Sequence, residues 1–221
     1  MNKENLKESI ESNYDIKVLA IEKVKNSYRL ETENTNYAIK IIKYDFPHFY
    51  FILSAIEHLQ KREFHKIPQI LNNKDGTKYI KLENSYAYLT EWIPSRVSNY
   101  DNPIELSKVA EKLGELHTSS TGFNINNNMR PRIGWYSWIN VFNTRCNEIL
   151  DFKNRINQKA YKSNFDYIYL KSLDDEIKRG KRAIQSLISH RYMEVMDKEV
   201  KKFGFCHHDF AHHNILIDEK G

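Results

Sequence analysis

The chain has 221 residues, 40% of them hydrophobic and 13% aromatic, which is enough to bury a core in one large domain or in two lobes. Its 34 Lys and Arg residues against 29 Asp and Glu residues give a net charge of +5. The basic clusters are interleaved with helix formers, which argues against a nucleic-acid partner, and no stretch has the apolar length of a membrane span. With only Cys146 and Cys206 and no signal peptide at its start, the sequence predicts a reduced intracellular chain.

The first part of the chain predicts strands around one helix. Residues 26–33 and 37–42 predict two strands of a hairpin, with the polar Asn34-Thr35-Asn36 as its turn. A helix is expected next, since apolar residues recur at helical spacing at Phe49, Ile52, Leu53, Ile56 and Leu59. Residues 79–82 and 87–92 predict two further strands.

The second part is predicted to be mostly helical. Asn102-Pro103 is a typical helix start, with Pro at the first helical position. Further helical patterns cover residues 136–152, 167–188 and 192–202. Two short strands, residues 203–206 and 215–217, are expected to flank a polar loop near the end of the chain.

That polar loop contains the most informative pattern, His207-x-Asp209-x-x-x-x-Asn214. In the catalytic loop of kinases the Asp at this spacing accepts the proton of the attacking hydroxyl, and the Asn binds a magnesium ion held on the nucleotide phosphates. Two other interpretations remain open for this segment. It could be a polar turn between strands, or its four histidines, His207, His208, His212 and His213, could form a metal cluster.

Three further positions fit nucleotide chemistry. Lys40 is the last residue of Ala38-Ile39-Lys40, which matches the end of the kinase V-A-I-K motif, whose lysine neutralises the α- and β-phosphates of the nucleotide. A lysine in a strand can also simply face solvent. Glu57 follows Leu53 by one helical turn and could pair with Lys40, or be an ordinary surface residue. Residues 91–93, Glu91-Trp92-Ile93, could hydrogen-bond an adenine through their backbone, or be a plain strand end.

Taken together, these segments resemble the aminoglycoside phosphotransferase and choline kinase superfamily, and within it the CotS-type spore coat proteins of spore-forming bacteria. The resemblance runs from about residue 27 to residue 221 and rests on a few segments. These are residues 51–59, residues 89–93, Leu116-His117, residues 121–123 and, most specifically, residues 206–214.

The resemblance implies a two-lobed, protein-kinase-like α+β fold, with a sheet-rich nucleotide-binding N-lobe over residues 1–92 and a helical C-lobe over residues 93–221. It implies transfer of the ATP γ-phosphate to a hydroxyl of a small molecule. Asp209 would be the catalytic base and Asn214 the magnesium ligand. The nucleotide would be bound by Lys40, held by Glu57, and by the backbone of Glu91 and Ile93.

It also implies ATP and Mg²⁺ as cofactors, synthesis in the cytoplasm, and association with the spore coat and its other proteins. The runner-up is a structural or interaction protein of the coat that reuses the scaffold without catalysis.

Two departures from the superfamily pattern matter. No glycine precedes Gly76, so the loop expected to cover the phosphates, Lys25-Asn26-Ser27, contains none, and only Asn26 tolerates left-handed geometry well. The second metal-binding Asp is expected beyond Gly221, because Asp218 comes too early, in the predicted turn of residues 218–221. The chain is therefore expected to be the front two-thirds of a longer protein.

Overall fold

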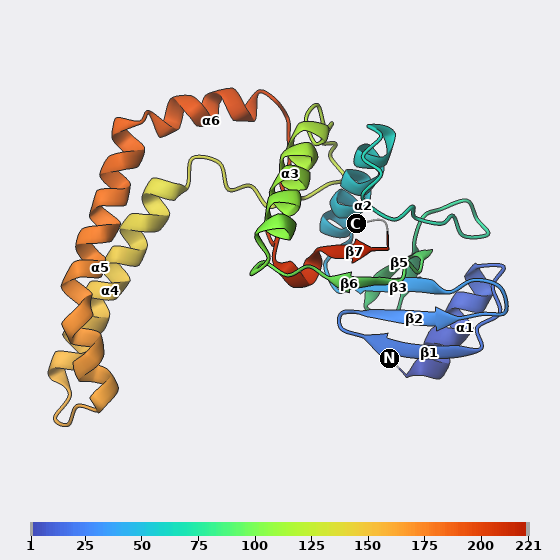
Figure 1. Cartoon of the computed structure of the whole chain (residues 1–221), viewed down its shortest axis with the longest axis horizontal. Helices are drawn as coiled ribbons and strands as arrows, with labels where there is room; N and C mark the ends of the chain where they lie inside the picture. Colours follow the sequence, from blue (N-terminus) through green and yellow to red (C-terminus); the bar gives the residue numbers. More distant parts are fainter. Residues whose placement is uncertain (1, 220–221) are drawn as a thin grey trace. The chain divides into compact units, whose positions relative to one another are not determined.

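The structure, a computed structural model, describes residues 2–219 and divides into two compact units (Figure 1). The first unit comprises residues 1–131 and 203–221, and the second comprises residues 132–202. The predicted turn at residues 218–221 includes Lys220 and Gly221, which lie outside the described residues.

A five-stranded antiparallel sheet forms the body of the first unit. Its strand order is β1-β2-β3-β5-β4. The strands are β1 (Ala20–Val24), β2 (Ser27–Glu31), β3 (Tyr37–Ile42), β4 (Ile80–Leu82) and β5 (Ser85–Glu91). The predicted hairpin corresponds to β2 and β3, whose register pairs Tyr28 with Ile39 and Leu30 with Tyr37. β1 was not predicted from the sequence.

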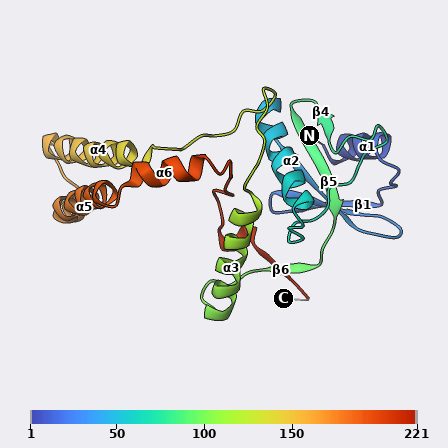
Figure 2. The ribbon, with the colours of Figure 1, turned by 90° about the horizontal axis from the view of Figure 1, so that it is seen from above.

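Two helices, α1 (Lys3–Asn13) and α2 (Phe46–Lys61), pack on opposite faces of this sheet; in Figure 2, β5 runs between them. Alternate residues of β5 divide between two cores, because successive strand side chains point to opposite faces. Ala87 and Leu89 join the core under α1, whereas Tyr86 and Tyr88 pack with α2. The expectation of a single helix in this part was wrong. Only two residues of α1 are buried, so its apolar stripe is weak in the sequence.

In the same compact unit, α3 (Pro103–Ser119) begins where Asn102-Pro103 predicts, and the Asn102 side chain accepts a hydrogen bond of 3.0 Å from the Ile104 N–H. A small second sheet pairs β6 (Ser95–Val97) with β7 (Leu216–Asp218), and the single turn η1 (His212–Asn214) precedes β7. The strand predicted at residues 215–217 is therefore present, shifted by one residue.

The strand predicted at residues 203–206 is absent from the described structure. Phe203 has a positive φ of 50°, and the Phe205 N–H donates to the Ser120 hydroxyl at 3.3 Å instead of to a neighbouring strand. Phe205 packs against a small core that joins the end of α2 to α3, with Leu59 and Leu116 at its centre. The apolar run is thus explained by helix packing rather than by sheet pairing.

These contacts divide the chain differently from the expected lobes of residues 1–92 and 93–221. Leu116 of α3 and Phe210 of the loop belong to the same core as Leu59 of α2. The Phe123 N–H also donates to the Phe203 carbonyl at 2.9 Å, joining the two chain segments on either side of residues 132–202. The compact unit around the sheet therefore includes α3 and the last described residues, and the lobe boundary at residue 92 stays a proposal.

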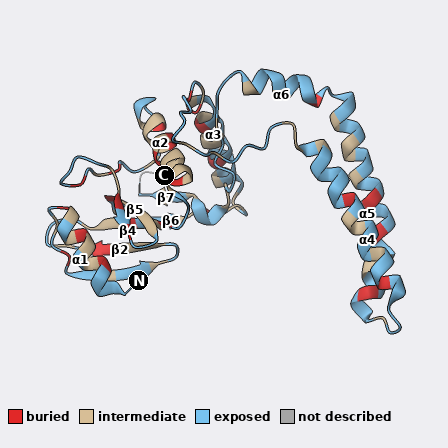
Figure 3. Cartoon of the chain, turned by 180° about the vertical axis from the view of Figure 1, so that it is seen from behind, coloured by how far each residue is buried: buried red, intermediate tan, exposed pale blue. Residues whose placement is uncertain are grey.

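The second unit is helical, as predicted: α4 (Trp138–Gln158) lies beside α5 (Asn164–Ser189), and α6 (Tyr192–Val200) follows. A capping box starts α5, in which the Ser163 hydroxyl and the Asp166 carboxylate each bond the other's backbone N–H. The Lys159 ammonium donates to Asp166 at 2.7 Å and is the main reason that the pKa of this buried carboxyl is lowered. Much of the surface of this unit remains exposed (Figure 3).

Among the described residues, no helix combines the length and apolar character that crossing a membrane requires.

A glycine fixes the spacing of α4 and α5. A Cβ atom at Gly180 would lie within contact of the Cys146 sulfur, closer than atoms can approach without displacement. Gly180→Ala should therefore lower the free energy of unfolding, by about 1–3 kcal/mol for overpacking, although alanine is the better helix former.

The matched control is Gly114→Ala in α3, where an added Cβ meets no atom within 4 Å. That variant should gain up to about 1 kcal/mol. Urea unfolding followed by circular dichroism measures both variants. A stabilising Gly180→Ala would show that the two helices are not this close.

Candidate functional site

Lys40 projects from the face of the sheet that α2 covers. Its β3 neighbours Ile39 and Ile41 belong to the core under α1, so Lys40 points to the opposite side. It pairs across the ladder with Tyr88 of β5 and is exposed. Burial raises the pKa of Tyr88 to about 12, so its hydroxyl stays protonated beside the lysine.

The expected ion pair between Lys40 and Glu57 is not formed among the described residues. Glu57 pairs instead with Lys78, at 3.5 Å between the ammonium and the carboxylate. Glu57 lies on the edge of the buried stripe of α2, and the segment that leads into β4 supplies the nearer cation. The structure thus corrects the partner of Glu57.

The loop at residues 207–214 brings Asp209 and Asn214 together. The Asn214 side-chain amide donates two hydrogen bonds of 2.9 Å, one to the Asp209 carboxylate and one to its backbone carbonyl. The turn η1 places Asn214 for this contact, since its N–H bonds the Ala211 carbonyl at 2.9 Å. His208 adopts a positive φ of 67°, which turns the chain sharply just before Asp209.

Residues that follow β6 hold this loop from its other side. Ser98 is buried; its hydroxyl donates to the His212 carbonyl at 3.1 Å and its N–H to the Ile215 carbonyl at 2.9 Å. The Tyr100 hydroxyl donates to the Phe210 carbonyl at 2.7 Å. Three donor groups, two from Ser98 and one from Tyr100, therefore fix the path of the chain through the loop.

The start of α3 stiffens the β6 segment in turn. Arg96 donates two hydrogen bonds to the Glu105 carboxylate, at 2.8 and 3.1 Å, a bidentate arrangement. The Asn99 N–H donates to the same carboxylate at 2.8 Å. The bonds from Arg96 and Asn99 lower the pKa of Glu105 to about 2, so this carboxylate is ionised at any physiological pH.

Lys40 lies close enough to the loop to influence the protonation of His207. Burial lowers the pKa of His207, and the positive charge of Lys40 is the second cause of this lowering. His207 also packs edge-on against Phe210, with ring centroids 5.7 Å apart. Lys40 and Asp209, the residues predicted for phosphate binding and for catalysis, are 169 positions apart in the sequence and belong to one compact unit.

Residues 91–93 form the continuation of β5. Glu91 pairs with Tyr37, and the Trp92 N–H donates to the Asn36 carbonyl at 2.9 Å. Ile93 is 44% exposed, and the Ser95 hydroxyl donates to its carbonyl at 3.0 Å. Within residues 2–219 no protein group accepts from the Ile93 N–H, so this donor is available to a ligand.

The side chains at the loop fit a metal ion only in part. Both hydrogen bonds of Asn214 use its nitrogen, which leaves its amide oxygen, the atom that a cation would bind, without a protein partner in the described part of the chain. Nowhere in residues 2–219 do three His, Cys, Asp or Glu side chains gather as metal ligands, so the histidine-cluster interpretation was wrong. A single protein ligand such as Asn214 suits a Mg²⁺ ion that takes most of its ligands from phosphates and water.

Comparison with known proteins assigns this arrangement to a family. A family model described as "Spore coat putative kinase YutH" matches residues 7–220. The chain belongs to the YutH spore coat kinase family. It is also 22% identical, over 184 residues, to spore coat protein S of Bacillus subtilis (strain 168). That match covers 83% of this chain and 52% of the relative, so the chain spans about half the length of this relative.

Solved structures show the same fold. An aminoglycoside phosphotransferase from Alicyclobacillus acidocaldarius superposes with a TM-score of 0.84 at 18% identity, covering 96% of this chain and 62% of the other. Spectinomycin phosphotransferase APH(9)-Ia, in complex with ADP and spectinomycin, superposes with a TM-score of 0.59 at 16% identity, over 98% and 65% of the two chains. The predicted kinase-like α+β fold of aminoglycoside phosphotransferase type is confirmed.

Relative to the usual phosphate-covering loop, the YutH-family chain has a tight turn. Val24 pairs with Ser27, so Lys25 and Asn26 alone connect β1 to β2. Lys25, not Asn26, takes the left-handed conformation, with φ 53°. Asn26, the residue of this turn that best tolerates left-handed geometry, does not adopt it, because the position within the turn, rather than side-chain tolerance, sets the backbone angle.

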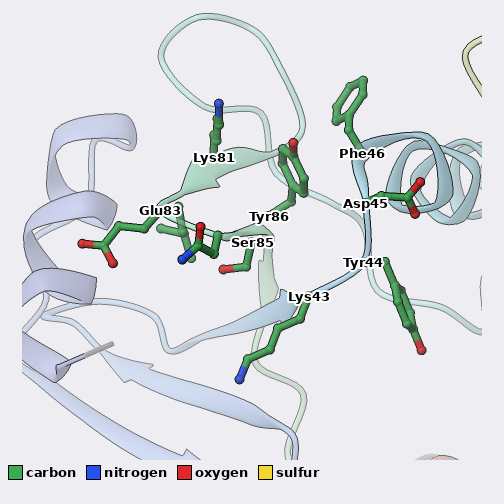
Figure 4. A pocket seen from close by; sticks show the side chains of 10 residues that line it. Lys43, Tyr44, Asp45, Phe46, Lys81, Glu83, Ser85 and Tyr86 are labelled. Carbon is green, nitrogen blue, oxygen red and sulfur yellow. The ribbon is translucent and has the colours of Figure 1, made fainter.

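A separate hollow lies between the β3–α2 connection and the β4–β5 turn (Figure 4). Lys43, Asp45, Lys81 and Glu83 line it, a mixture of both charges. Lys40, Asp209 and Asn214 do not line it, and Asp45 also accepts from Arg130 at 3.2 Å. The chemistry of the loop, rather than this hollow, therefore identifies the candidate site.

Sequence reasoning missed Arg29, which shares the sheet face of Lys40. Its guanidinium carbon lies 5.4 Å from the centre of the Trp92 ring. The alternation of β2, in which Tyr28 and Leu30 join the core under α1, could have identified the face of Arg29, but only once the α1 core was known.

Removing the charge of Lys40 tests whether it neighbours the loop. In Lys40→Met the pKa of His207 should rise toward its ordinary value, because a nearby cation disfavours protonation of the imidazole. Titration of the His207 ring proton by NMR measures it. Lys81→Met, an exposed lysine of β4 that does not contribute to this pKa, is the control. If His207 titrates identically in Lys40→Met and in the wild type, Lys40 does not lie near His207.

The backbone at His208 provides a second test. A left-handed conformation costs an ordinary L-residue about 1–2 kcal/mol, and a β-branched side chain more. His208→Gly should thus keep the free energy of unfolding or raise it by up to about 1 kcal/mol, after the entropic cost of glycine. His208→Val should lower it by about 1–2 kcal/mol.

His213→Gly, within the right-handed turn η1, is the control and should destabilise by about 0.5–1 kcal/mol. Urea denaturation compares the variants. Equal losses in both glycine variants would contradict the left-handed geometry at His208.

Proposed function

We propose that the full-length protein transfers the γ-phosphate of ATP to a hydroxyl group of a small molecule. The observation that carries the proposal is the contact of Asp209 with Asn214. It is supported by the pKa of the neighbouring His207, which is lowered by burial and, second, by the charge of Lys40. Phosphoryl transfer requires mainly positioning and charge stabilisation, so one carboxylate, one metal-binding amide and one phosphate-binding cation are its central protein groups.

Lys40 would bind the α- and β-phosphates. It is exposed and forms no ion pair within residues 2–219, so no protein carboxylate neutralises it there. The adenine would hydrogen-bond to the backbone of Glu91 and Ile93, whose N–H is available. Glu57 is not assigned the role of holding Lys40, because it pairs with Lys78.

Asp209 would orient the acceptor hydroxyl and accept its proton. The amide of Asn214 holds one carboxylate oxygen in place, which fixes the direction of the other oxygen toward an acceptor. Asn214 would offer its free amide oxygen to Mg²⁺, which when bound would supply positive charge to the phosphates. The proposal places both cofactors, ATP and Mg²⁺, between the sheet face of Lys40 and this loop.

The relatives support the class of ligand. The solved spectinomycin phosphotransferase is in complex with ADP and spectinomycin in one structure and with AMP in another. We infer a nucleotide and a small hydroxyl-bearing acceptor for this chain on that basis. From the family and from spore coat protein S we further infer synthesis in the cytoplasm, association with the spore coat and contacts with other coat proteins.

A second candidate is a coat protein that uses the kinase scaffold without catalysis. The tight turn of Lys25 and Asn26 favours it, since its backbone has no glycine with which to approach phosphates closely. So does the composition of the proposed metal site, because Asn214 would be a neutral ligand and no group of three His, Cys, Asp or Glu side chains accompanies it within residues 2–219. The intact Asp209–Asn214 contact favours the enzyme.

Paired substitutions in the full-length protein decide between the two functions. Asp209→Asn should reduce turnover by roughly 10²- to 10⁴-fold while leaving Mg·ATP affinity nearly unchanged, because Asp209 acts on the acceptor. Lys40→Met should instead weaken Mg·ATP binding. ATP consumption with a panel of hydroxyl acceptors measures turnover, and calorimetry measures the affinity for Mg·ATP.

The control is Asp101→Asn, an exposed carboxylate outside the loop, which should change neither quantity. Absence of magnesium-dependent nucleotide binding in the wild-type full-length protein would reject the kinase and leave the scaffold function.

A further inference from the structure

Arg29 lies on the same face of the sheet as Lys40, in the next row along the strands. In this row Arg29 of β2 pairs with Ala38 of β3, which pairs with Thr90 of β5. The row of Lys40 and Tyr88 is two residues away on each strand. At about 3.3 Å per residue, the two rows are roughly 7 Å apart.

Beyond the row of Arg29, the residue that follows β5 on this face of the sheet is Trp92. Trp92 follows Thr90 by two residues, so it continues on the same side of the sheet. The order along the face is thus Lys40, then Arg29, then Trp92. The available Ile93 N–H lies at the Trp92 end, away from Lys40.

Arg29 has a hydrogen-bonding capacity that the protein does not use. Its Nε is shielded from solvent, and within residues 2–219 it has no hydrogen-bond partner. The guanidinium instead lies over the Trp92 ring, with its carbon 5.4 Å from the ring centre. A buried donor without an acceptor is unfavourable, so the site gains if a ligand places an acceptor in the guanidinium plane. The face of the guanidinium that does not cover Trp92 can separately stack on an aromatic ring.

We propose that Arg29 is the nucleobase contact of this site, with its guanidinium stacked on the purine and supported by Trp92. The inference rests on the proposed function, since it requires that the site bind a nucleotide. A planar, charged guanidinium stacks on aromatic rings in a way that an ammonium does not. Arg29 would thus add affinity for the nucleotide from β2, the strand that follows the glycine-free turn of Lys25 and Asn26.

The spacing favours the base over the phosphates as the partner of Arg29. Lys40 lies near His207 of the loop, so the phosphates belong at that end. Arg29 lies one row farther from the loop end, next to Trp92 and the Ile93 N–H, where a purine can stack and accept a hydrogen bond. An extended nucleotide would then run along the face from Trp92 to Lys40.

Calorimetry on the full-length protein tests this assignment with two probes, Mg·ADP and Mg·pyrophosphate, which share phosphates but not the base. Arg29→Met keeps the length of the side chain and its packing but removes the guanidinium. Arg29→Lys keeps the charge without the plane. Lys40→Met provides the phosphate comparison, and Arg179→Met, an exposed arginine of α5, is the control.

Arg29→Met should weaken Mg·ADP binding by about 3- to 30-fold and change Mg·pyrophosphate binding by less than about twofold. Arg29→Lys should lose nearly as much ADP affinity, whereas Lys40→Met should weaken both probes. The fluorescence of Trp92, one of three tryptophans, should respond to ADP and not to pyrophosphate.

Two results overturn the inference while the proposed function stands: unchanged ADP affinity in Arg29→Met, or equal losses for ADP and pyrophosphate. The second result would make Arg29 a phosphate contact. If wild-type protein binds no Mg·ADP, the proposed function fails and this inference fails with it.

Discussion

The pairing of β6 with β7 is the constraint on which the candidate site depends. It joins residues 95–97 to residues 216–218 across the whole of α3 and the second unit. Ser98 and Tyr100, immediately after β6, then bond three carbonyls of the loop that holds Asp209. The loop has little regular structure of its own, so these bonds replace a ladder or a helix in fixing its backbone. Glu105, bonded by Arg96 and Asn99, connects the same segment to α3.

The second constraint is the strict alternation of the central strands. Ile39 and Leu89 are fully buried in the core under α1, and this burial forces Lys40 and Tyr88 to the other face. A slip of one residue in register would place Lys40 in the apolar core and remove it from the loop. Arg29, Ala38 and Thr90 obey the same rule, so the candidate nucleotide face follows from packing on the opposite side of the sheet.

The ion pair of Glu57 shows how a kinase-like scaffold can carry its residues in an altered arrangement. The carboxylate pairs with Lys78, and both side chains are about one-third exposed. Within residues 2–219 Lys40 forms no ion pair, and Arg29 adds a second cation to the same face of the sheet. Two cations on one face favour an anionic ligand, which is consistent with both the proposed kinase activity and the proposed nucleobase contact.

The sequence by itself determined the elements whose signals are local. The spacing of His207, Asp209 and Asn214, the Asn102-Pro103 helix start and the alternation of β3 each involve only a few neighbouring residues. Tertiary structure decided what depends on distant partners. Only packing shows that residues 203–206 serve a helix contact rather than a sheet, that Glu57 meets Lys78, and that Arg29 stands over Trp92. The physical reason is that periodicity gives the face on which a side chain lies, whereas its partner on that face depends on chain segments that the fold brings together from elsewhere.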